Sequence, residues 1–214
     1  MYVPAHFAAK DGDALVAKLA RAHAGVLVTV GSEGEPLASH LPFLWDAAAR
    51  TLTGHIARAN PHWTQGGGKG LVIFSGADAY VSPGFYPSKA EHGKVVPTWN
   101  YEAVYLSGAV TWIEDGARLE TIVRALSDRH ETGRAKPWRI EDAPRAYIDA
   151  LLRGIVGVEM RVEKIEAKQK LSQNKNAADF DGVMRGLGAQ EGESREVAAL
   201  MAGVRAGSSD PDSN

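Results

Sequence analysis

The chain contains no cysteine among its 214 residues. This absence excludes a disulfide scaffold, a thiolate nucleophile, an iron–sulfur cluster and every cysteine-ligated zinc site. Long apolar runs are missing as well, since no stretch approaches the roughly 20 apolar residues that a membrane-spanning helix needs. The first residues also lack the basic start and the apolar run of a secretion signal. We therefore expect a cytoplasmic protein with no membrane partner.

An excess of charge of one sign is also missing, because 24 Lys and Arg residues face 26 Asp and Glu residues, for a formal net charge of -2. Proteins that coat nucleic acid or anionic membranes depend on a clear excess of positive charge, so this balance argues against both roles. The hydrophobic fraction of 44% and the charged fraction of 23% are typical of a folded domain. Without cysteine, any redox chemistry must come from a bound cofactor.

Short apolar or alternating runs between turn residues predict a mainly β fold. We expect strands over residues 26–30, 37–45, 51–57, 71–74, 79–81, 105–113 and 155–165. Amphipathic patterns predict helices over residues 118–130, 143–153 and 195–205, and around residues 15–20 and 180–187. Strands interrupted by so few helices do not fit a βαβ parallel sheet. We therefore expect a closed or nearly closed antiparallel barrel with peripheral helices, an α+β fold that is mainly β.

The chain shows no internal repeat and no linker that would separate two domains. We expect one domain over residues 1–190, followed by a C-terminal helix and polar tail over residues 191–214. The end of this tail, residues 207–214, is rich in Ser and Asp and is expected to fray.

The most informative motif lies where the strand over residues 51–57 ends. Asn60 is a good N-cap, and Pro61 suits the first helical position, where its missing N–H costs nothing. Arg58 places a guanidinium two residues before this helix start, whose unpaired N–H groups attract anions. Strand end, arginine and helix start together predict a phosphate site. The alternative is an ordinary surface arginine beside an ordinary capped helix.

Two further segments are candidates for ligand contacts. Residues 82–101 form a long loop in which Trp99 and Tyr101 offer flat surfaces to a conjugated ring, and Asn100 can hydrogen-bond to a heterocycle. The alternative is a packed loop that covers one end of the barrel. Residues 168–175 are rich in lysine, and Ser172 or Asn174 is expected to cap the helix that follows. A solvated strand end explains these lysines better than a DNA-binding patch.

Other known motifs are not present. The glycine-rich run 66–70 lacks both the first glycine and the Ser or Thr of a phosphate loop, so a flexible loop is expected there. The histidines His40, His55, His62 and His92 are scattered and match no metal-binding pattern. No nucleophile elbow occurs, so serine hydrolysis has no support.

Four separate runs, in order along the chain, resemble the PaiB family, the FMN-binding negative transcriptional regulators of bacteria. The runs are 1–7, 54–63, 96–101 and 168–174, and the resemblance extends to about Leu187. It implies a flavin-reductase-like split β-barrel similar to the pyridoxamine phosphate oxidases, with an antiparallel Greek-key arrangement. It also implies a homodimer that holds FMN in the cleft between its two subunits.

The resemblance further implies a set of FMN contacts. Arg58 and the helix start at Asn60 hold the phosphate, while Ser39, His40 and the strand over residues 55–57 run beside the ribityl chain and the ring. The remaining members close the site, some of them from the second subunit. The complete set is Ser39, His40, His55, Ile56, Ala57, Arg58, Asn60, Thr98, Trp99, Asn100, Lys170, Ser172, Gln173 and Asn174.

Three functions stay open at this point. The family name implies a negative regulator of transcription, but the sequence offers no helix-turn-helix with a basic recognition helix, so direct contact with DNA is weakly supported. The competing hypothesis is an FMN-dependent oxidoreductase, in which the flavin accepts hydride from NAD(P)H or a small reductant. The third is a split barrel that binds heme or another tetrapyrrole, for which no axial-ligand motif is present.

Overall fold

A computed structural model describes residues 1–206 of the chain. The helices are α1 (Gly12–Ala22), α2 (His62–Gln65), α3 (Ser88–His92), α4 (Gly116–Glu131), α5 (Arg145–Arg153), α6 (Ala177–Gly188) and α7 (Glu193–Ala206). The strands are β1 (Gly25–Gly31), β2 (Pro36–Leu41), β3 (Leu44–Asp46), β4 (Thr51–Ala57), β5 (Gly66–Val81), β6 (Thr98–Ile113) and β7 (Ile155–Lys170). Short 3-10 helices span Ala5–Phe7, Pro83–Phe85 and Ile140–Asp142. Within residues 1–206, none of the helices has the length and apolar character needed to cross a membrane.

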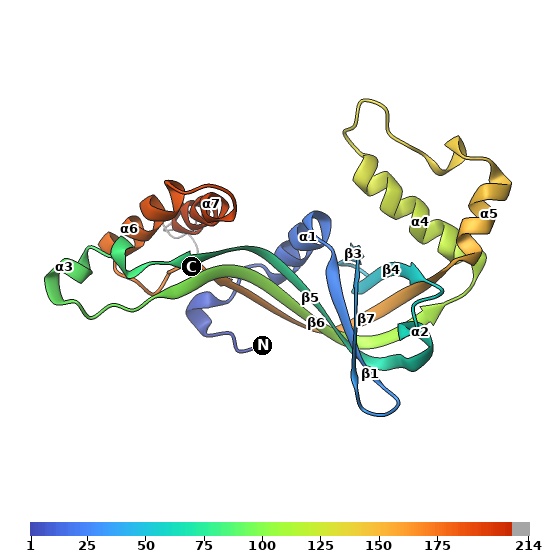
Figure 1. Cartoon of the computed structure of the whole chain (residues 1–214), viewed down its shortest axis with the longest axis horizontal. Coiled ribbons are helices and arrows are strands. Elements are labelled where there is room, and N and C mark those ends of the chain that lie inside the picture. The colour runs from blue at the N-terminus through green and yellow to red at the C-terminus, as the bar shows by residue number, and fades with distance from the viewer. Residues whose placement is uncertain (207–214) are drawn as a thin grey trace. The chain divides into compact units, whose positions relative to one another are not determined.

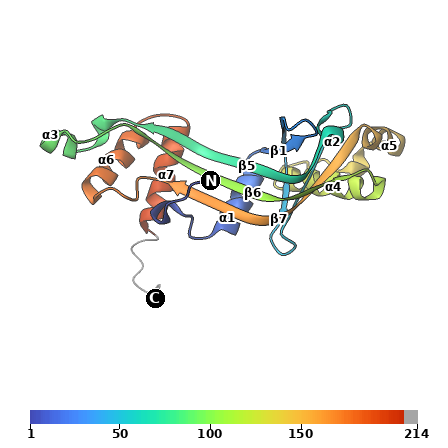
Figure 2. The same ribbon diagram turned by 90° about the horizontal axis from the view of Figure 1, so that it is seen from below.

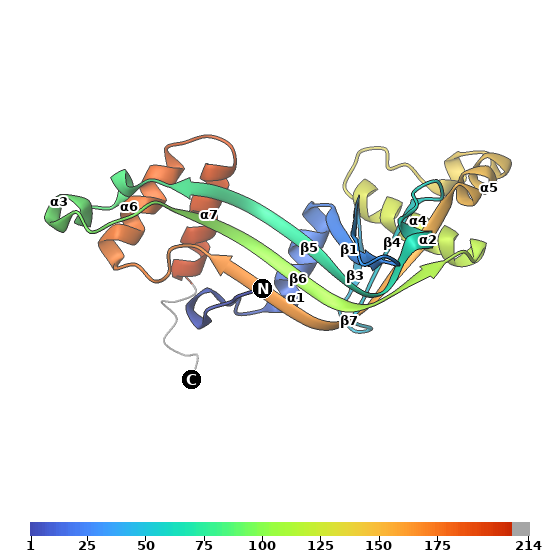
Figure 3. The same ribbon diagram turned by 60° about the horizontal axis from the view of Figure 1, so that its bottom comes forward.

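The seven strands form one antiparallel sheet in the order β2-β1-β5-β6-β7-β4-β3. Figure 3 shows β5, β6 and β7 as long neighbouring strands. This sheet with its surrounding helices confirms the predicted mainly β, antiparallel fold. The chain divides into two compact units: unit 1 comprises residues 1–11, 75–103 and those from 167 on, and unit 2 comprises residues 12–74 and 104–166.

The expected strand over residues 37–45 is interrupted. β2 ends at Leu41 and β3 begins at Leu44, so two separate strands replace one. Pro42 lies between them and has no N–H to donate to a neighbouring strand, which explains the break.

The glycine-rich run 66–70, expected as a flexible loop, is instead the beginning of β5. Here Gly66 pairs with Gly31 of β1. A Cβ on Gly66 would lie only 2.2 Å from the Thr29 hydroxyl, so a glycine is needed for the two strands to come this close. The expected loop over residues 82–101 also contains more regular structure than predicted, because α3 lies within it and β6 already begins at Thr98.

Unit 2 has apolar side chains on both faces of its part of the sheet, and α4 covers one of these faces. The rings of Phe43 and Phe74 are fully buried and meet edge to face at 6.0 Å. Helix α4 packs against β4, and its side chain Leu119 would meet any Cβ placed on Gly157 of the neighbouring β7. Figure 1 shows α4 and α5 as consecutive helices near the end of β4 and the beginning of β7. These two helices flank the residues that follow β4.

Unit 1 has its own apolar core beneath α6 and α7, which Figure 2 shows side by side. The inward side chains of β5 pack against this helix pair through Phe180, Val183, Val197 and Met201, among others. The cap of α6 is Asn176, whose side chain accepts a hydrogen bond of 2.8 Å from the Asp179 N–H, and not Ser172 or Asn174 as expected. The predicted division at residue 190 stays a prediction, and the tail 207–214 lies outside the described residues.

Candidate functional site

A buried hydrogen-bond network lies beneath the turn that follows β4. The imidazole of His62 is 3% exposed, and its two nitrogens are hydrogen-bonded to the hydroxyls of Thr29 at 2.8 Å and Ser39 at 2.9 Å. Asn60 completes the network, because its side chain donates to the Ser39 hydroxyl at 3.0 Å and accepts from the His62 N–H at 3.0 Å. The network therefore ties the turn to β1 and β2.

The neutral form of His62 satisfies this network. The Ser39 hydroxyl accepts from Asn60 and can still donate to Nδ1 of His62, and in that tautomer Nε2–H donates to Thr29. Burial lowers the pKa of His62 below its ordinary value of 6.5, which favours this neutral imidazole. The Trp112 ring meets the imidazole edge to face at 5.6 Å. His62 is thus a positioning residue that sequence reasoning missed, although its place two residues after Asn60 was a usable signal.

Arg58 lies at the end of β4 and is held on several sides. Its guanidinium donates to the carbonyls of Arg153 at 3.0 Å and Ile155 at 3.2 Å, and to the carboxylate of Glu114 at 2.8 Å. The Trp63 indole N–H donates to the Arg58 carbonyl at 2.8 Å, and the guanidinium lies over the same ring. These contacts orient the side chain and leave further N–H groups of the guanidinium for a ligand.

The helix expected at Asn60 is much shorter than the prediction required. Helix α2 has four residues, and Pro61 is its N-cap, so Asn60 lies one position earlier than expected. A single turn has almost no macrodipole, because the dipole is the sum of aligned peptide units. The start of α2 therefore adds little to the predicted phosphate site, which depends on Arg58.

The other predicted contacts of unit 2 lie at different depths. Ile56 is a buried core residue, whereas His40 and Ala57 are exposed. His55 is opposite Gly157 in the β4–β7 register and so shares the face that α4 covers. Its Nδ1 is buried without a hydrogen-bond partner among the described residues, and burial lowers its pKa. His40 and Ala57 are therefore the predicted contacts with the most open surroundings.

The predicted contacts of unit 1 separate into buried and exposed groups. Asn100 is fully buried and exchanges hydrogen bonds of 3.0 and 3.1 Å with the Ser172 hydroxyl, while its amide also reaches Met201 at 3.5 Å. Ser172 has a positive φ of 65° at the end of β7, so the backbone turns sharply there. The amide of Gln173 also stays within the chain, since it bonds to the backbone of Leu171 and Gln169.

The second group of unit 1 combines exposed aromatic rings with a half-buried lysine. The Trp99 ring is 51% exposed and meets the Tyr80 ring edge to face at 6.2 Å. The Lys170 ammonium donates to the Thr98 hydroxyl and to the Trp99 carbonyl. Burial, with the nearby charges of Lys168 and Lys175, lowers the pKa of Lys170. Asn174 is also exposed.

FMN presents a phosphate dianion and a flat aromatic ring, and residues of both kinds of contact are present. Arg58 borders an open pocket of about 680 Å³ and retains N–H groups for a phosphate. Exposed indole surface suited to stacking on a planar ring is provided by Trp99. Each of these residues is thus of a kind that suits one part of FMN, and their assignment as FMN contacts stays a prediction.

The chain matches the family model described as "Putative FMN-binding domain" over residues 1–164. It is 32% identical over 206 residues to Protease synthase and sporulation protein PAI 2 of Bacillus subtilis, and the match covers 94% of this chain and 96% of that protein. An uncharacterized protein of Aspergillus fumigatus is 36% identical over 212 residues, with 76% of this chain and 81% of that protein covered.

Solved structures share the fold at low sequence identity. The FAD and heme binding protein of Mycobacterium smegmatis superposes with a TM-score of 0.57 at 17% identity, and the match covers 81% of this chain and 78% of that one. The flavocytochrome Anf3 of Azotobacter vinelandii gives a TM-score of 0.56 at 15% identity, covering 84% and 78%. The fold is thus the split β-barrel of flavin-binding proteins, as predicted.

Proposed function

The chain belongs to the PaiB family of FMN-binding proteins, with FMN as its cofactor, and on that premise we propose that it acts in the cytoplasm as a homodimeric negative regulator of transcription. The observation that carries the proposed mode of FMN binding is the turn 58–62, which the buried network of His62, Ser39 and Asn60 fixes from below. A ligand contact that is ordered beforehand costs less entropy on binding, so a fixed turn favours affinity.

Each residue of the turn has a defined task in this proposal. Arg58 donates to the phosphate oxygens of FMN, while Glu114 keeps the guanidinium oriented. Asn60 holds the turn against Ser39, and the exposed Ala57 and His40 leave neighbouring surface for the ribityl chain. Bound FMN supplies an isoalloxazine ring that can accept and donate hydride or single electrons.

The proposed dimer forms through the outer face of β1, β2 and β5. Val26 and Val28 of β1 lie opposite Ile73 and Leu71 of β5, and all four are only partly buried in the single chain. Val30, on the same face of β1, is 60% exposed. An exposed stripe of uncharged aliphatic side chains is buried most favourably against another apolar surface. A second copy of the chain provides an identical stripe.

The exposed residues of unit 1 are proposed to contact FMN as well. Trp99 offers a stacking surface, and Lys170 offers a cation beside it. The buried pair of Asn100 and Ser172 has a different task in this proposal: it holds the end of β7 against α7, and its substitution affects the fold before it affects the ligand.

The regulatory role is proposed to work without a DNA-reading helix. The pair α6–α7 has a connection of helix-turn-helix length, but α7 carries two glutamates and two arginines, and its apolar side packs into the core of unit 1. A recognition helix needs a basic, accessible face for phosphates and base edges. We therefore propose that the protein regulates through another protein or through its flavin state.

FMN binding is tested by the visible spectrum of the purified protein and by quenching of FMN fluorescence on titration. We expect a flavin spectrum or saturable quenching with one FMN per chain, and a mass of two chains in solution. A colourless protein that leaves FMN fluorescence unchanged would contradict the proposal.

A gel-shift experiment and an NAD(P)H-oxidation assay on the same flavin-loaded protein test the role. The proposal predicts neither a specific DNA shift with the purified protein nor sustained NAD(P)H oxidation, together with raised transcription of target genes when the gene is deleted. Rapid NAD(P)H consumption without any effect on transcription would favour the FMN-dependent oxidoreductase instead.

A further inference from the structure

Lys170, the last residue of β7 in unit 1, has uncharged hydrogen-bond partners. Its half-buried amine donates to the Thr98 hydroxyl and to the Trp99 carbonyl. Within residues 1–206 it forms no ion pair with a carboxylate. A neutral amine has two N–H groups and one lone pair, so these two acceptors satisfy it completely and leave the lone pair free.

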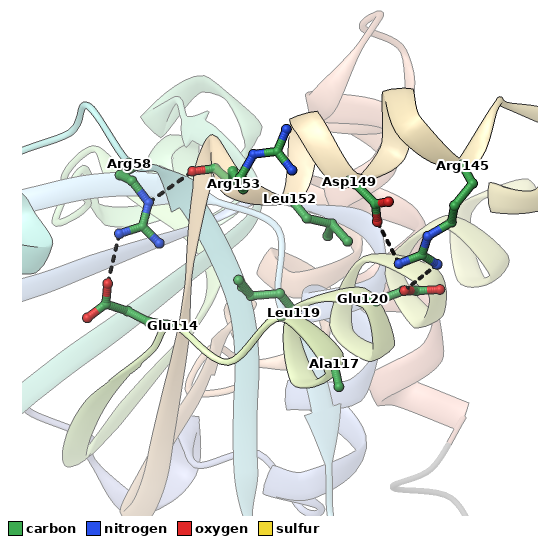
Figure 4. Close-up of a pocket in the computed structure, with 10 residues that line it drawn as sticks. Arg58, Glu114, Ala117, Leu119, Glu120, Arg145, Asp149, Leu152 and Arg153 are labelled. Carbon is green, nitrogen blue, oxygen red and sulfur yellow. Dashed lines mark hydrogen bonds and ion pairs between the residues drawn. The ribbon is translucent and has the colours of Figure 1, made fainter.

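Arg145, in the open pocket of unit 2, shows the usual surroundings of a cation. Dashed lines in Figure 4 join its guanidinium to the carboxylates of Glu120 and Asp149, at 2.8 Å and 2.7 Å. Carboxylates at this distance favour the charged form of their partner. Lys170 lacks such a contribution, because its two hydrogen bonds go to neutral oxygens.

A second lysine on the same face of β7 places a positive charge near Lys170. Lys168 lies two residues earlier in the strand, so the two side chains point to the same side of the sheet. Its ammonium donates to the Tyr2 carbonyl at 3.1 Å and lies over the rings of Tyr2, Phe7 and Tyr101, at 5.9, 5.9 and 5.3 Å from their centroids. Aromatic faces attract a cation, so this cage holds the ammonium in place. A fixed cation disfavours a second positive charge beside it.

These surroundings favour the neutral amine of Lys170. Burial, with the nearby charges of Lys168 and Lys175, lowers its pKa, so at a given pH more of it is uncharged than in an ordinary exposed lysine. An uncharged lysine amine is a nucleophile toward carbonyl groups, whereas an ammonium is not. The residue whose carbonyl it contacts, Trp99, also provides exposed indole surface. A nucleophile and a stacking surface thus belong to the same part of unit 1.

We propose that Lys170 binds an aromatic aldehyde as an imine, with the ring of the aldehyde stacked on Trp99. The amine nitrogen forms a bond to the aldehyde carbon, and the two amine hydrogens leave with the carbonyl oxygen as one molecule of water. No oxidant or reductant takes part, and water reverses the step. The Tyr80 ring, which meets Trp99 edge to face at 6.2 Å, supports the stacking surface. The inference goes beyond the proposed function, because the imine forms without FMN.

The test uses salicylaldehyde as the probe and sodium cyanoborohydride to reduce the imine to a stable secondary amine, on the full chain as purified. Peptide mass spectrometry gives the rate of labelling at each lysine. Lys164 is the internal control, because it lies on β7, is exposed and pairs with Glu166 at 3.1 Å. At about pH 7.5, Lys170 is expected to be labelled at least about threefold faster than Lys164.

Two substitutions test the surroundings of the amine. Lys168→Met removes the neighbouring charge and keeps an apolar chain among the rings, so the rate at Lys170 should fall about threefold relative to Lys164. The matched control Lys89→Met removes an exposed charge of α3 and should leave the ratio of the two rates unchanged. Trp99→Ala should lower this ratio for salicylaldehyde and leave it unchanged for propanal, which has no ring to stack.

The wild type alone can overturn the proposal, so the result does not depend on how well a variant folds. It is overturned if Lys170 is labelled no faster than Lys164, or if propanal and salicylaldehyde give the same ratio of the two rates. A failure of FMN binding, with Lys170 still labelled faster, would contradict only the proposed function.

Discussion

Two asparagines near the ends of strands have different roles in the two units. Asn60, in unit 2, uses its amide to hold a surface turn against Ser39 and His62, and the neighbouring Arg58 faces an open pocket. Asn100, in unit 1, uses its amide to hold Ser172 and contacts Met201 in the interior. Both pairs join an asparagine to a serine, yet Asn60 is partly exposed, whereas Asn100 is fully buried. Burial, and not residue type, distinguishes the asparagine of the candidate site from the asparagine that supports the fold.

The largest effect is expected from removing the imidazole beneath the turn. His62→Ala leaves the buried hydroxyls of Thr29 and Ser39 without their partner and creates a cavity, so the free energy of unfolding should fall by about 3 kcal/mol. FMN affinity should fall as well, because the turn loses its support. Urea denaturation and FMN titration measure the two effects. The matched control Thr29→Val should cost about 1 kcal/mol and keep FMN affinity near that of the wild type.

A substitution of Asn100 in unit 1 is expected to lower stability less, and to leave the affinity for FMN unchanged. Asn100→Ala removes the buried partner of Ser172, and the free energy of unfolding should fall by about 2 kcal/mol. At a temperature where the variant is folded, its FMN Kd should equal that of the wild type. Asn174→Ala, at an exposed position, is the control and should change stability by less than about 0.5 kcal/mol. A tenfold weaker FMN complex with unchanged stability would make Asn100 a ligand contact after all.

Much of the fold could be predicted from local patterns, because most strands alternate and the helices are amphipathic. The predictions are wrong where a tertiary contact determines the local structure. The run 66–70 reads as a loop, and only its pairing with β1 makes it a strand. The helix at Pro61 has a good start signal, but β5 begins five residues later at Gly66 and limits it to one turn. Local signals contain no information about such partners.

The candidate site was predictable in part. Arg58 and Asn60 could be singled out because strand end, cation and turn residue are adjacent in the sequence. In the sequence His62 is one scattered histidine, since its partners Thr29 and Ser39 are distant along the chain. The burial of Asn100 depends on α7, about 100 residues later, and no local pattern shows it.

A modest change in affinity is expected at the exposed ring of unit 1. Trp99→Ala removes a stacking surface worth about 1 kcal/mol, so FMN should bind roughly fivefold more weakly while the free energy of unfolding stays nearly constant. Trp99→Phe keeps an aromatic face and should restore most of the affinity. Fluorescence quenching gives both values. If Trp99→Ala binds FMN as the wild type does, the exposed group of unit 1 has no role in the cofactor site.

The stability of the protein is also expected to depend on pH. Burial lowers the folded pKa of His62 and His55 below the unfolded value of 6.5, so below that pH the unfolded chain binds protons that the folded chain does not. The contribution of the two histidines to the free energy of unfolding is therefore fully present above about pH 6.5. It is lost as the pH falls, and each histidine accounts for at most about 1.4 kcal/mol per pH unit. Urea denaturation at about pH 7.5 and about pH 5.5 measures the loss, which should be smaller in His55→Gln.

Arg58 on its fixed turn is proposed to hold the phosphate of FMN, and the ratio of FMN to riboflavin affinity tests this contact. Riboflavin has the same ring and ribityl chain without the phosphate, so the ratio isolates the phosphate contact. We expect the wild type to prefer FMN at least about tenfold, and Arg58→Gln to lose most of this preference while riboflavin binding stays unchanged. An Arg58→Gln protein that is folded and keeps the full preference for FMN would contradict the account.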